Sequence, residues 1–382
     1  MDTETRGSQG LGLRNSGILP SQALRSLIQA GEILSDDPAL PDQVQPASLD
    51  LQLGSVAYRV RASFLPGPER TVAQRIDELA MHEIDLTRGA VLETGCVYIV
   101  PLQERLALNS RIAGMANPKS STGRLNVFTR LIVDRASEFD SVPAGYAGPL
   151  YAEIAPNAFS ILVHKGTRLN QLRLRRGSPN VGDKALEKLH EEVGLLGDEA
   201  AAQIRRGLVF TVDLDAGQDV PVGYRAKRHT GVIDLQKLVH YDPREFWEPL
   251  PGNLRRDLIL DPNEFYILAS RESVRIPPAF AAEMIPYDTQ IGEFRVHYAG
   301  FFDPGFGWKD GGAGTPAVLE VRSHEVPFIL EHGQAVGRLV YERLAAEPDT
   351  LYGAEIGSSY HSQGLTLSKH FRPWTGAWRP KD

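Results

Sequence analysis

The sequence predicts an all-β protein made of two copies of one unit, and three observations lead to that prediction. The chain has 382 residues with 36 glycines and 26 prolines, more than a helical bundle tolerates and fewer than a disordered chain carries. Short apolar runs with a period of two recur along the chain between turn residues, which is typical of a β-barrel or β-sandwich. An internal repeat indicates that this unit occurs twice.

The first unit follows a polar, glycine-dotted stretch, residues 1–16, which we expect to be flexible. Ser21 is expected to cap a helix with apolar residues at helical spacing, and Gly31 to end it. From there the period changes to two. In residues 47–54 leucines alternate with polar residues, which predicts a strand with one face on a core and the other toward water. Further strands are expected at residues 56–60, 97–101, 131–133, 150–154, 161–163 and 169–174.

The repeat defines the predicted domain organisation. Leu92 aligns with Leu260 (260 − 92 = 168), and Gly166 aligns with Gly333 (333 − 166 = 167). Between the copies, residues 183–196 have the pattern of an amphipathic linker helix closed by Gly197. We therefore expect a flexible N-terminus (1–16), a first barrel (17–175), a linker (176–206), a second barrel (207–345) and a tail (346–382). The tail is a candidate active-site lid, and its deletion after Leu351 is expected to stop turnover and leave the fold intact.

Composition excludes several classes of function. The balance of 41 Lys and Arg against 48 Asp and Glu gives a net charge of −7, without the basic excess typical of non-specific duplex binding. The single cysteine, Cys96, allows no intrachain disulfide and no cysteine-rich zinc site. No apolar run reaches eighteen residues, and the first sixteen lack the apolar core of a signal peptide. We expect a cytoplasmic protein without nucleic-acid or membrane partners.

The densest polar cluster of the first copy is a candidate phosphate site. Lys119, Ser120, Ser121 and Arg124 combine two hydroxyls and two cations beside a glycine, and such a turn can meet several oxygens of a polyphosphate. A solvated Ser/Thr/Gly turn explains the same residues equally well. The aligned residues 286–292 of the second copy lack both cations, so phosphate binding is expected in the first copy alone.

Two glutamates are candidates for general acid/base catalysis. Glu320 follows a hairpin at residues 297–308, and Glu153 follows the corresponding hairpin of the first copy. Each glutamate is flanked by apolar strand residues. Burial of such a carboxyl raises its pKa toward the range where it can both take and give a proton. An outward-facing strand glutamate is the alternative in each case.

These segments resemble dCTP deaminase of the trimeric dUTPase-like superfamily, in its long, internally duplicated bacterial form. The resemblance covers about residues 17–371. It rests on the opening helix, the strand at 45–51, the Lys119-to-Arg124 motif, the Asp-Pro-Gly hairpin with Glu320, and the tail at 360–368. It implies two distorted barrels of the dUTPase-like (β-clip) type and hydrolytic deamination of dCTP to dUTP and ammonia. The substrate would carry Mg²⁺ on its triphosphate. No zinc is implied, and a zinc deaminase would need a C-x-x-C pair that one cysteine cannot supply.

The resemblance also implies roles for single residues. Ser120, Ser121 and Arg124 match its phosphate side, together with Lys119, and Glu320 matches its catalytic glutamate. The backbone of Ala299 would read the pyrimidine, and Gln363 would close over the base. Further candidates are His297 and Asp303 of the hairpin, on the pyrimidine side, and Tyr360 of the tail.

Two questions about assembly and activity stay open in the sequence. We favour a composite site, with phosphates on the first copy and the base against Glu320; the alternative uses Glu153 across an oligomer axis. Asp140 before Gly145-Tyr146 resembles dUTPase, so dUTPase activity, alone or combined with deamination, is a second candidate function. A nucleotide-binding module without turnover is the third. Expected partners are dCTP, dUTP, dTTP as a candidate inhibitor, and further copies in a homo-oligomer.

Overall fold

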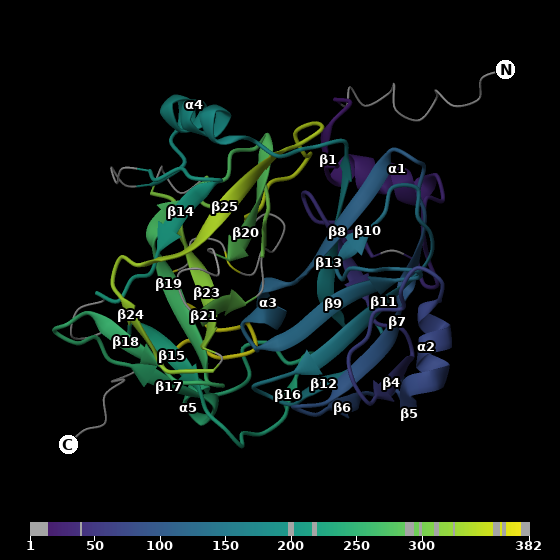
Figure 1. Ribbon diagram of the computed structural model, residues 1–382, viewed down its shortest axis with the longest axis horizontal. Helices are drawn as coiled ribbons and strands as arrows, with labels where there is room; N and C mark the ends of the chain where they lie inside the picture. The colour runs from purple at the N-terminus through teal and green to yellow at the C-terminus, as the bar shows by residue number, and fades with distance from the viewer. Residues whose placement is uncertain are drawn as a thin grey trace.

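The computed structural model describes residues 14–38, 40–197, 202–215, 220–286, 294–297, 300–308, 313–323, 325–353, 360 and 364–375. Within them strands predominate and helices are few and short, which confirms the predicted all-β class. Figure 1 shows two strand-rich halves side by side, one coloured purple to teal and the other green to yellow. Most of the stretch predicted to be flexible, residues 1–13, lies outside the described residues.

The first half contains two antiparallel sheets. One has the order β1 (Gly17–Ile18), β13 (Arg168–Arg176), β8 (Ile112–Pro118), β10 (Ser141–Val142), with β3 (Leu49–Gln52) also paired to β13. The other has the order β5 (Ala80–Asp85), β4 (Val56–Val60), β7 (Val97–Ala107), β11 (Ala147–Pro156), β9 (Val127–Val133), with β2 (Ile33–Ser35) also paired to β7. The second sheet buries apolar residues on both faces. Val100 and Leu131 belong to the main core, whereas their neighbours Ile99 and Ile132 belong to a smaller cluster with Val72 and Ile76.

The second half repeats this arrangement. One sheet has the order β14 (Leu208–Thr211), β25 (Ala335–Arg343), β20 (Phe280–Pro286), β22 (Phe301–Phe302). The other has the order β17 (Trp247–Leu250), β15 (Gly223–Ala226), β19 (Phe265–Val274), β23 (Thr315–Ser323), β21 (Phe294–His297). A two-stranded sheet pairs β18 (Asp257–Leu260) with β24 (Phe328–Glu331). Equivalent strands keep the spacing of the sequence repeat: β7 and β19 start 168 positions apart (265 − 97), and β13 and β25 start 167 apart (335 − 168).

The halves share one sheet and one hydrophobic core. β12 (Ile161–Val163) pairs with β6 (Ala90–Leu92) and, in parallel, with β16 (Ile233–Asp234) of the second half. The ring of Phe159 packs on Phe246 and Trp247 at centroid distances of 5.7 and 5.3 Å. Phe371 of the tail joins the same aromatic cluster, 5.4 Å from Phe246. This core therefore extends from the first half into part of the second half and the tail, while a separate core around Phe210 and Leu319 fills the rest of the second half.

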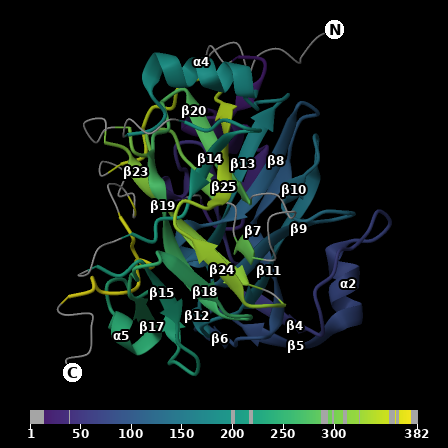
Figure 2. The same ribbon diagram turned by 60° about the vertical axis from the view of Figure 1, so that its left-hand side comes forward.

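The helices are short and connect the sheets. They are α1 (Ser21–Gln29), the 3₁₀ turn η1 (Pro41–Gln43), α2 (Val72–Leu79), α3 (Ser120–Gly123), α4 (Asp183–Val193) and α5 (Pro243–Phe246). Figures 1 and 2 place α4 at one end of the molecule and α5 at the other. No helix in the part of the chain that the structure describes is long and apolar enough to cross a membrane.

Three details of the sequence prediction were wrong. Pro20 occupies the N-cap of α1, and Ser21 is its first helical residue. The linker helix ends before Gly194, whose φ of 63° stops it earlier than the predicted Gly197 because a residue with positive φ cannot continue a right-handed helix. The polar face of β3 does not point to water, because Asp50 and Gln52 are buried there and line a cavity.

Candidate active site

A tight turn at the end of β8 presents the predicted phosphate motif. The amide of Lys119 donates to the carbonyl of Leu169 (2.9 Å), and the hydroxyl of Thr122 donates to the same oxygen (2.8 Å). These bonds fix α3 on the neighbouring strand β13. Ser121 and Arg124 are buried, so the turn is not the solvated loop that its composition also allowed.

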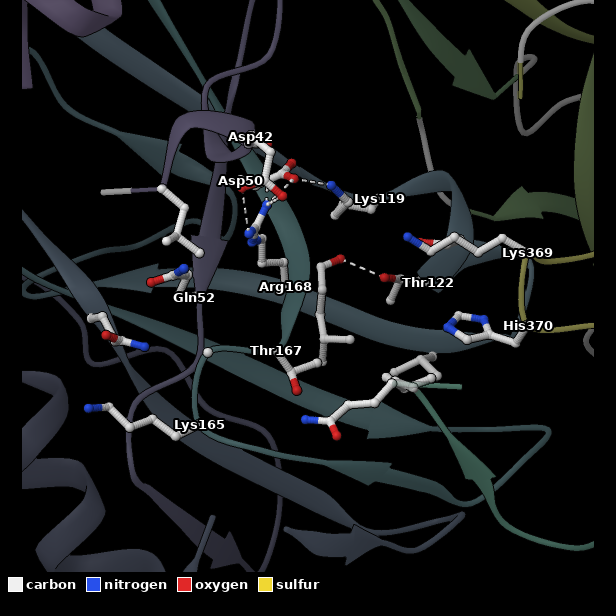
Figure 3. Close-up of a pocket in the computed structure, with 18 of the residues that line it drawn as sticks. Asp42, Asp50, Gln52, Lys119, Thr122, Lys165, Thr167, Arg168, Lys369 and His370 are labelled. Carbon is white, nitrogen blue, oxygen red and sulfur yellow. Dashed lines mark hydrogen bonds and ion pairs between the residues drawn. The ribbon is translucent and has the colours of Figure 1, made fainter. Parts of the chain in front are cut away.

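Ion pairs hold two cations beside this turn. Lys119 Nζ pairs with the buried carboxylate of Asp50, and Arg168 makes a bidentate pair with Asp42, with both N–O distances 3.1 Å. The bonds from Arg168 keep the pKa of Asp42 below its ordinary value. Figure 3 shows these pairs at one edge of a cavity of about 560 Å³, while Lys369 and His370 extend toward it from the tail. The cations are therefore preorganised where an anionic ligand can reach them.

Glu320 lies on β23, between β19 and β21, and a side chain on this central strand has little access to water. It is 5% exposed, and burial raises its pKa to about 8, with the charge of Arg124 acting in the opposite direction. It lines a small cavity of about 60 Å³. The walls come from Lys119, Ser120 and Arg124 of the first half and from Phe301, Phe302, Asp303 and Phe306 of the second.

Two further cavities continue this one. A cavity of about 210 Å³ shares Lys119, Phe301 and Asp303 with the Glu320 cavity. It shares Asp42, Arg168 and Lys369 with the 560 Å³ cavity. Lys119 borders all three. The three cavities thus follow one another past the turn, from a more apolar end that contains Glu320 to a polar end with several cations.

The C-terminal tail covers this row of cavities. Arg124 Nη1 donates to the carbonyl of Thr366 (3.0 Å), and the guanidinium carbon lies 3.7 Å from the centre of the Tyr360 ring. The hydroxyl of Ser368 donates to the carbonyl of Ser121 (2.9 Å). The yellow tail segment beside α3 in Figure 1 is this contact. The tail therefore binds the phosphate motif directly.

Comparison with known proteins identifies the family. The model of the 2'-deoxycytidine 5'-triphosphate deaminase N-terminal domain matches residues 15–178, and that of the C-terminal domain matches residues 182–371. The chain belongs to the dCTP deaminase family. A crystal structure of 2'-deoxycytidine 5'-triphosphate deaminase from Agrobacterium tumefaciens is 55% identical, with a TM-score of 0.84, and the match covers 88% of this chain and 100% of that one. The fold is accordingly of the dUTPase-like class.

Curated relatives in the dCTP deaminase family are more distant. A protein of Corynebacterium glutamicum (strain R), described as "dCTP deaminase, dUMP-forming", is 28% identical over 167 residues, 42% of this chain and 85% of the relative. A protein of Thermobifida fusca (strain YX) with the same description is 28% identical over 187 residues, 46% of this chain and 91% of the relative.

The two candidate glutamates of this family member have different surroundings. Glu153 is buried, but its Oε1 accepts bonds from Arg130 Nη2 (2.5 Å) and Nε (3.1 Å). The same guanidinium lies 3.4 Å from the centre of the Phe139 ring. Glu153 lines none of the three cavities, whereas Glu320 lines the smallest. The geometry therefore brings Lys119, Ser120, Arg124, Asp303, Tyr360 and Glu320 together and leaves Glu153 apart; Ser121 lines the two larger cavities.

The remaining predicted residues are only partly described. Ala299 and Gln363 lie outside the described residues. Of His297 the structure describes the backbone, which pairs with Glu320 in the register of β21 and β23. Among the described residues, no three His, Cys, Asp or Glu side chains converge as metal ligands.

Several residues of the cavities were not predicted for this family member. They are Asp42, Asp50, Arg168, Tyr352, Lys369 and His370. Asp50 was expected to face water, because a polar residue in a strand can face water as well as a cavity. Burial and the charge of Lys119 lower the pKa of Lys369, so this ammonium lies close to other cations. No local pattern marked Lys369, because the chain reaches the cavity only through its tertiary fold.

Proposed function

We propose that this protein hydrolyses the 4-amino group of dCTP, giving dUTP and ammonia, in the cavities between its halves. The observation that most directly supports this proposal is that the Lys119-to-Arg124 turn and Glu320 line the same small cavity. Membership of the dCTP deaminase family and the similarity to a solved dCTP deaminase support deamination of dCTP. A cation-bearing turn beside a protonated carboxyl suits a substrate with a triphosphate at one end and a protonatable ring at the other.

The order of the cavities suggests how the substrate is oriented. Cytosine would enter the small cavity against Phe301 and Phe306, with the 4-amino group toward Glu320. The triphosphate, carrying Mg²⁺ as part of the substrate, would pass the hydroxyls of Ser120 and Ser121. Its distal phosphates would then reach Arg168 and Lys369, which border the two larger cavities.

Glu320 would supply the proton transfers. With a pKa of about 8 the carboxyl is mainly protonated at neutral pH, so it can first protonate N3 of the ring. The resulting carboxylate accepts a proton from water as the water oxygen attacks C4. It then passes this proton to the 4-amino group, which leaves as ammonia. The new C4 hydroxyl returns its proton to the carboxylate, so Glu320 ends as it began and one water is consumed.

General acid/base catalysis of this kind contributes on the order of 10²- to 10⁴-fold. Orientation of the base must supply more of the rate enhancement, and the aromatic wall together with the tail would provide it by fixing the ring and excluding bulk water. No step requires zinc, and the sequence holds a single cysteine where zinc deaminases use two.

Formation of dUMP is a second candidate activity. Its support is the description of the curated relatives as dUMP-forming. Assays of ammonia and pyrophosphate from dCTP with Mg²⁺ separate the outcomes. Ammonia with dUTP supports deamination alone, ammonia with dUMP and pyrophosphate supports both reactions, and binding without either product supports a nucleotide-binding module. A homo-oligomer, inhibition by dTTP, a cytoplasmic location and the lack of nucleic-acid partners remain predictions.

The matched pair of glutamates tests the assignment of the acid/base. We expect Glu320→Gln to lower kcat for ammonia release by roughly 10²-fold or more, because the amide cannot exchange protons. Glu153→Gln should keep most of the activity, since its amide oxygen can still accept a bond from Arg130. Loss of turnover in Glu153→Gln with full turnover in Glu320→Gln would transfer the role to the first copy.

A further inference from the structure

Arg173 reaches from the first half into the second at the back of the candidate site. Its side chain, on β13, is 2% exposed. Its guanidinium donates four hydrogen bonds to the second half. Nη1 donates to the carbonyl of Ala282 (3.1 Å) and to Glu342 Oε2 (3.1 Å). Nη2 donates to the carbonyl of Phe302 (3.3 Å) and to Asp303 Oδ1 (3.4 Å). The guanidinium carbon also lies 4.0 Å from the centre of the Phe301 ring.

These contacts divide between a sheet and a hairpin. Ala282 and Glu342 belong to the paired strands β20 and β25, which form a continuous ladder. Phe302 and Asp303 belong to the hairpin, where β22 pairs with β20 over only two residues. The guanidinium thus clamps a short segment to a long, rigid one. Because its two terminal nitrogens face different segments, the relative position of hairpin and sheet is set at this point.

The clamped residues are those that form a wall of the cavities. Phe301 and Asp303 each line both the 60 Å³ and the 210 Å³ cavity. Arg173 itself lines none of the three cavities. The side chain of Arg173 therefore acts on the cavities indirectly, and Phe301 and Asp303 are the cavity residues that its guanidinium contacts.

We propose that Arg173 is a positioning residue, which holds the Phe301–Asp303 hairpin in the orientation that the substrate pocket needs. The candidate site of the second half then depends on an arginine of the first half. This inference rests on the proposed function. The contact between Arg173 and the hairpin involves neither the phosphate motif nor Glu320.

The charges around Arg173 explain why a cation is needed there. Asp303 and Glu342 both contact the guanidinium, and Glu283 lies close enough to Glu342 to raise the pKa of Glu283 through repulsion, in addition to the effect of burial. Burial raises the pKa of Asp303, and Arg173 acts against that rise. Without the cation, two buried carboxylates would have to take up protons or move apart.

Lysine cannot reproduce this arrangement. Four acceptors in two segments are met by the planar fork of one guanidinium, whereas an ammonium offers three donors from a single point. We expect Arg173→Lys to fold, to keep the charge and to lose the clamp. Glu342→Gln is the matched control, because its amide oxygen can still accept the bond from Arg173 Nη1, so it removes a charge from the cluster and keeps the clamp; Glu342 also lines none of the three cavities.

The test combines steady-state kinetics with hydrogen exchange in the full chain. Arg173→Lys should lower kcat/KM for dCTP at least about tenfold, while Glu342→Gln stays within about twofold of the wild type. In an Asp303→Asn background, Arg173→Lys should cause little further loss, because the two residues act through one hairpin. Equal losses in Arg173→Lys and Glu342→Gln, or fully additive losses with Asp303→Asn, would overturn the proposal.

Hydrogen exchange separates this proposal from the proposed function. Amides of residues 300–306 should exchange faster in Arg173→Lys than in the wild type, with no such change in Glu342→Gln. Absence of dCTP turnover in the wild type would refute the proposed function. The hydrogen-exchange rates of residues 300–306 would then decide by themselves whether Arg173 holds the hairpin. Unchanged exchange in Arg173→Lys would refute the clamp whatever the activity.

Discussion

Equivalent residues of the two copies have acquired different chemistry. Glu153 and Glu320 occupy matching positions on β11 and β23 (320 − 153 = 167), and both are buried. Arg130 forms an ion pair with Glu153, an arrangement typical of a structural carboxylate. Burial raises the pKa of Glu320 into the range useful for proton transfer. The two positions thus differ in that Glu153 is hydrogen-bonded to an arginine, whereas Glu320 lines a cavity that it shares with Arg124.

The raised pKa of Glu320 predicts a pH-dependent stability. Between the ordinary value of 4.5 and about 8, the folded protein keeps the proton that the unfolded chain releases, so this group lowers stability as pH rises through that window. The cost is about 1.4 kcal/mol per pH unit. Glu320→Gln should therefore gain Tm over the wild type progressively from pH 5 to pH 8 in calorimetry. A Tm difference that stays constant with pH would contradict the burial of this carboxyl.

For the tail, the structure differs most from what the sequence led us to expect. Leu367 and Phe371 are buried in the main core, and Phe371 is 5% exposed. The amide of Lys369 donates to the hydroxyl of Tyr360 (3.0 Å), which links two of the described parts of the tail, 360 and 364–375. A segment anchored in this way contributes to the fold as well as covering the site. We therefore expect its deletion to destabilise the protein, contrary to the expectation from the sequence.

Phe371→Ala tests this structural role. Removal of a buried phenylalanine side chain costs about 3–5 kcal/mol, so we expect a clear drop in Tm by calorimetry. Activity should fall as well, because Ser368 then loses its fixed position on Ser121. The neighbouring Arg372 is exposed and provides the matched control, so Arg372→Ala should leave Tm nearly unchanged. An unchanged Tm in Phe371→Ala would restore the view of a separable lid.

At the scale of the whole molecule, the halves are not independent barrels joined by a linker. The core around Phe159 includes Phe246 and Trp247 of the second half. Arg173 and the β12–β16 pair cross the same border. Contacts of this kind predict that the halves unfold together.

The distribution of tryptophan allows a direct test of this cooperativity. All four tryptophans, at positions 247, 308, 374 and 378, belong to the second half and tail. Ile99→Ala, in a core cluster made only of first-half residues, should shift the denaturant midpoint measured by tryptophan fluorescence, and far-UV circular dichroism should report the same shift. Separate transitions, with only the dichroism displaced, would show that the halves unfold independently.

Much of the fold could be predicted from the sequence. Period-two patterns identify strands from neighbouring residues alone, and the long repeat shows that the same set of strands occurs twice. The strand expected at residues 161–163 coincides with β12, and the repeat spacing recurs in the strand starts. Residues such as Asp50 were misassigned because a strand residue facing a cavity and one facing water are of the same polar type. Arg173 was missed because its partners lie 109 to 169 positions away, beyond any local pattern.

The presence of Lys119 and Glu320 in one chain has a consequence for how the candidate site can be lost. In a site built between separate subunits, dilution pulls the two walls apart. Here one chain carries both the wall with Lys119 and the wall with Glu320. The chain between them sets the effective concentration of one wall near the other, which is on the order of millimolar for a short flexible link and higher in a shared core. Because one covalent chain carries both walls, we expect this candidate site to survive a dilution that would dissociate a site built between subunits.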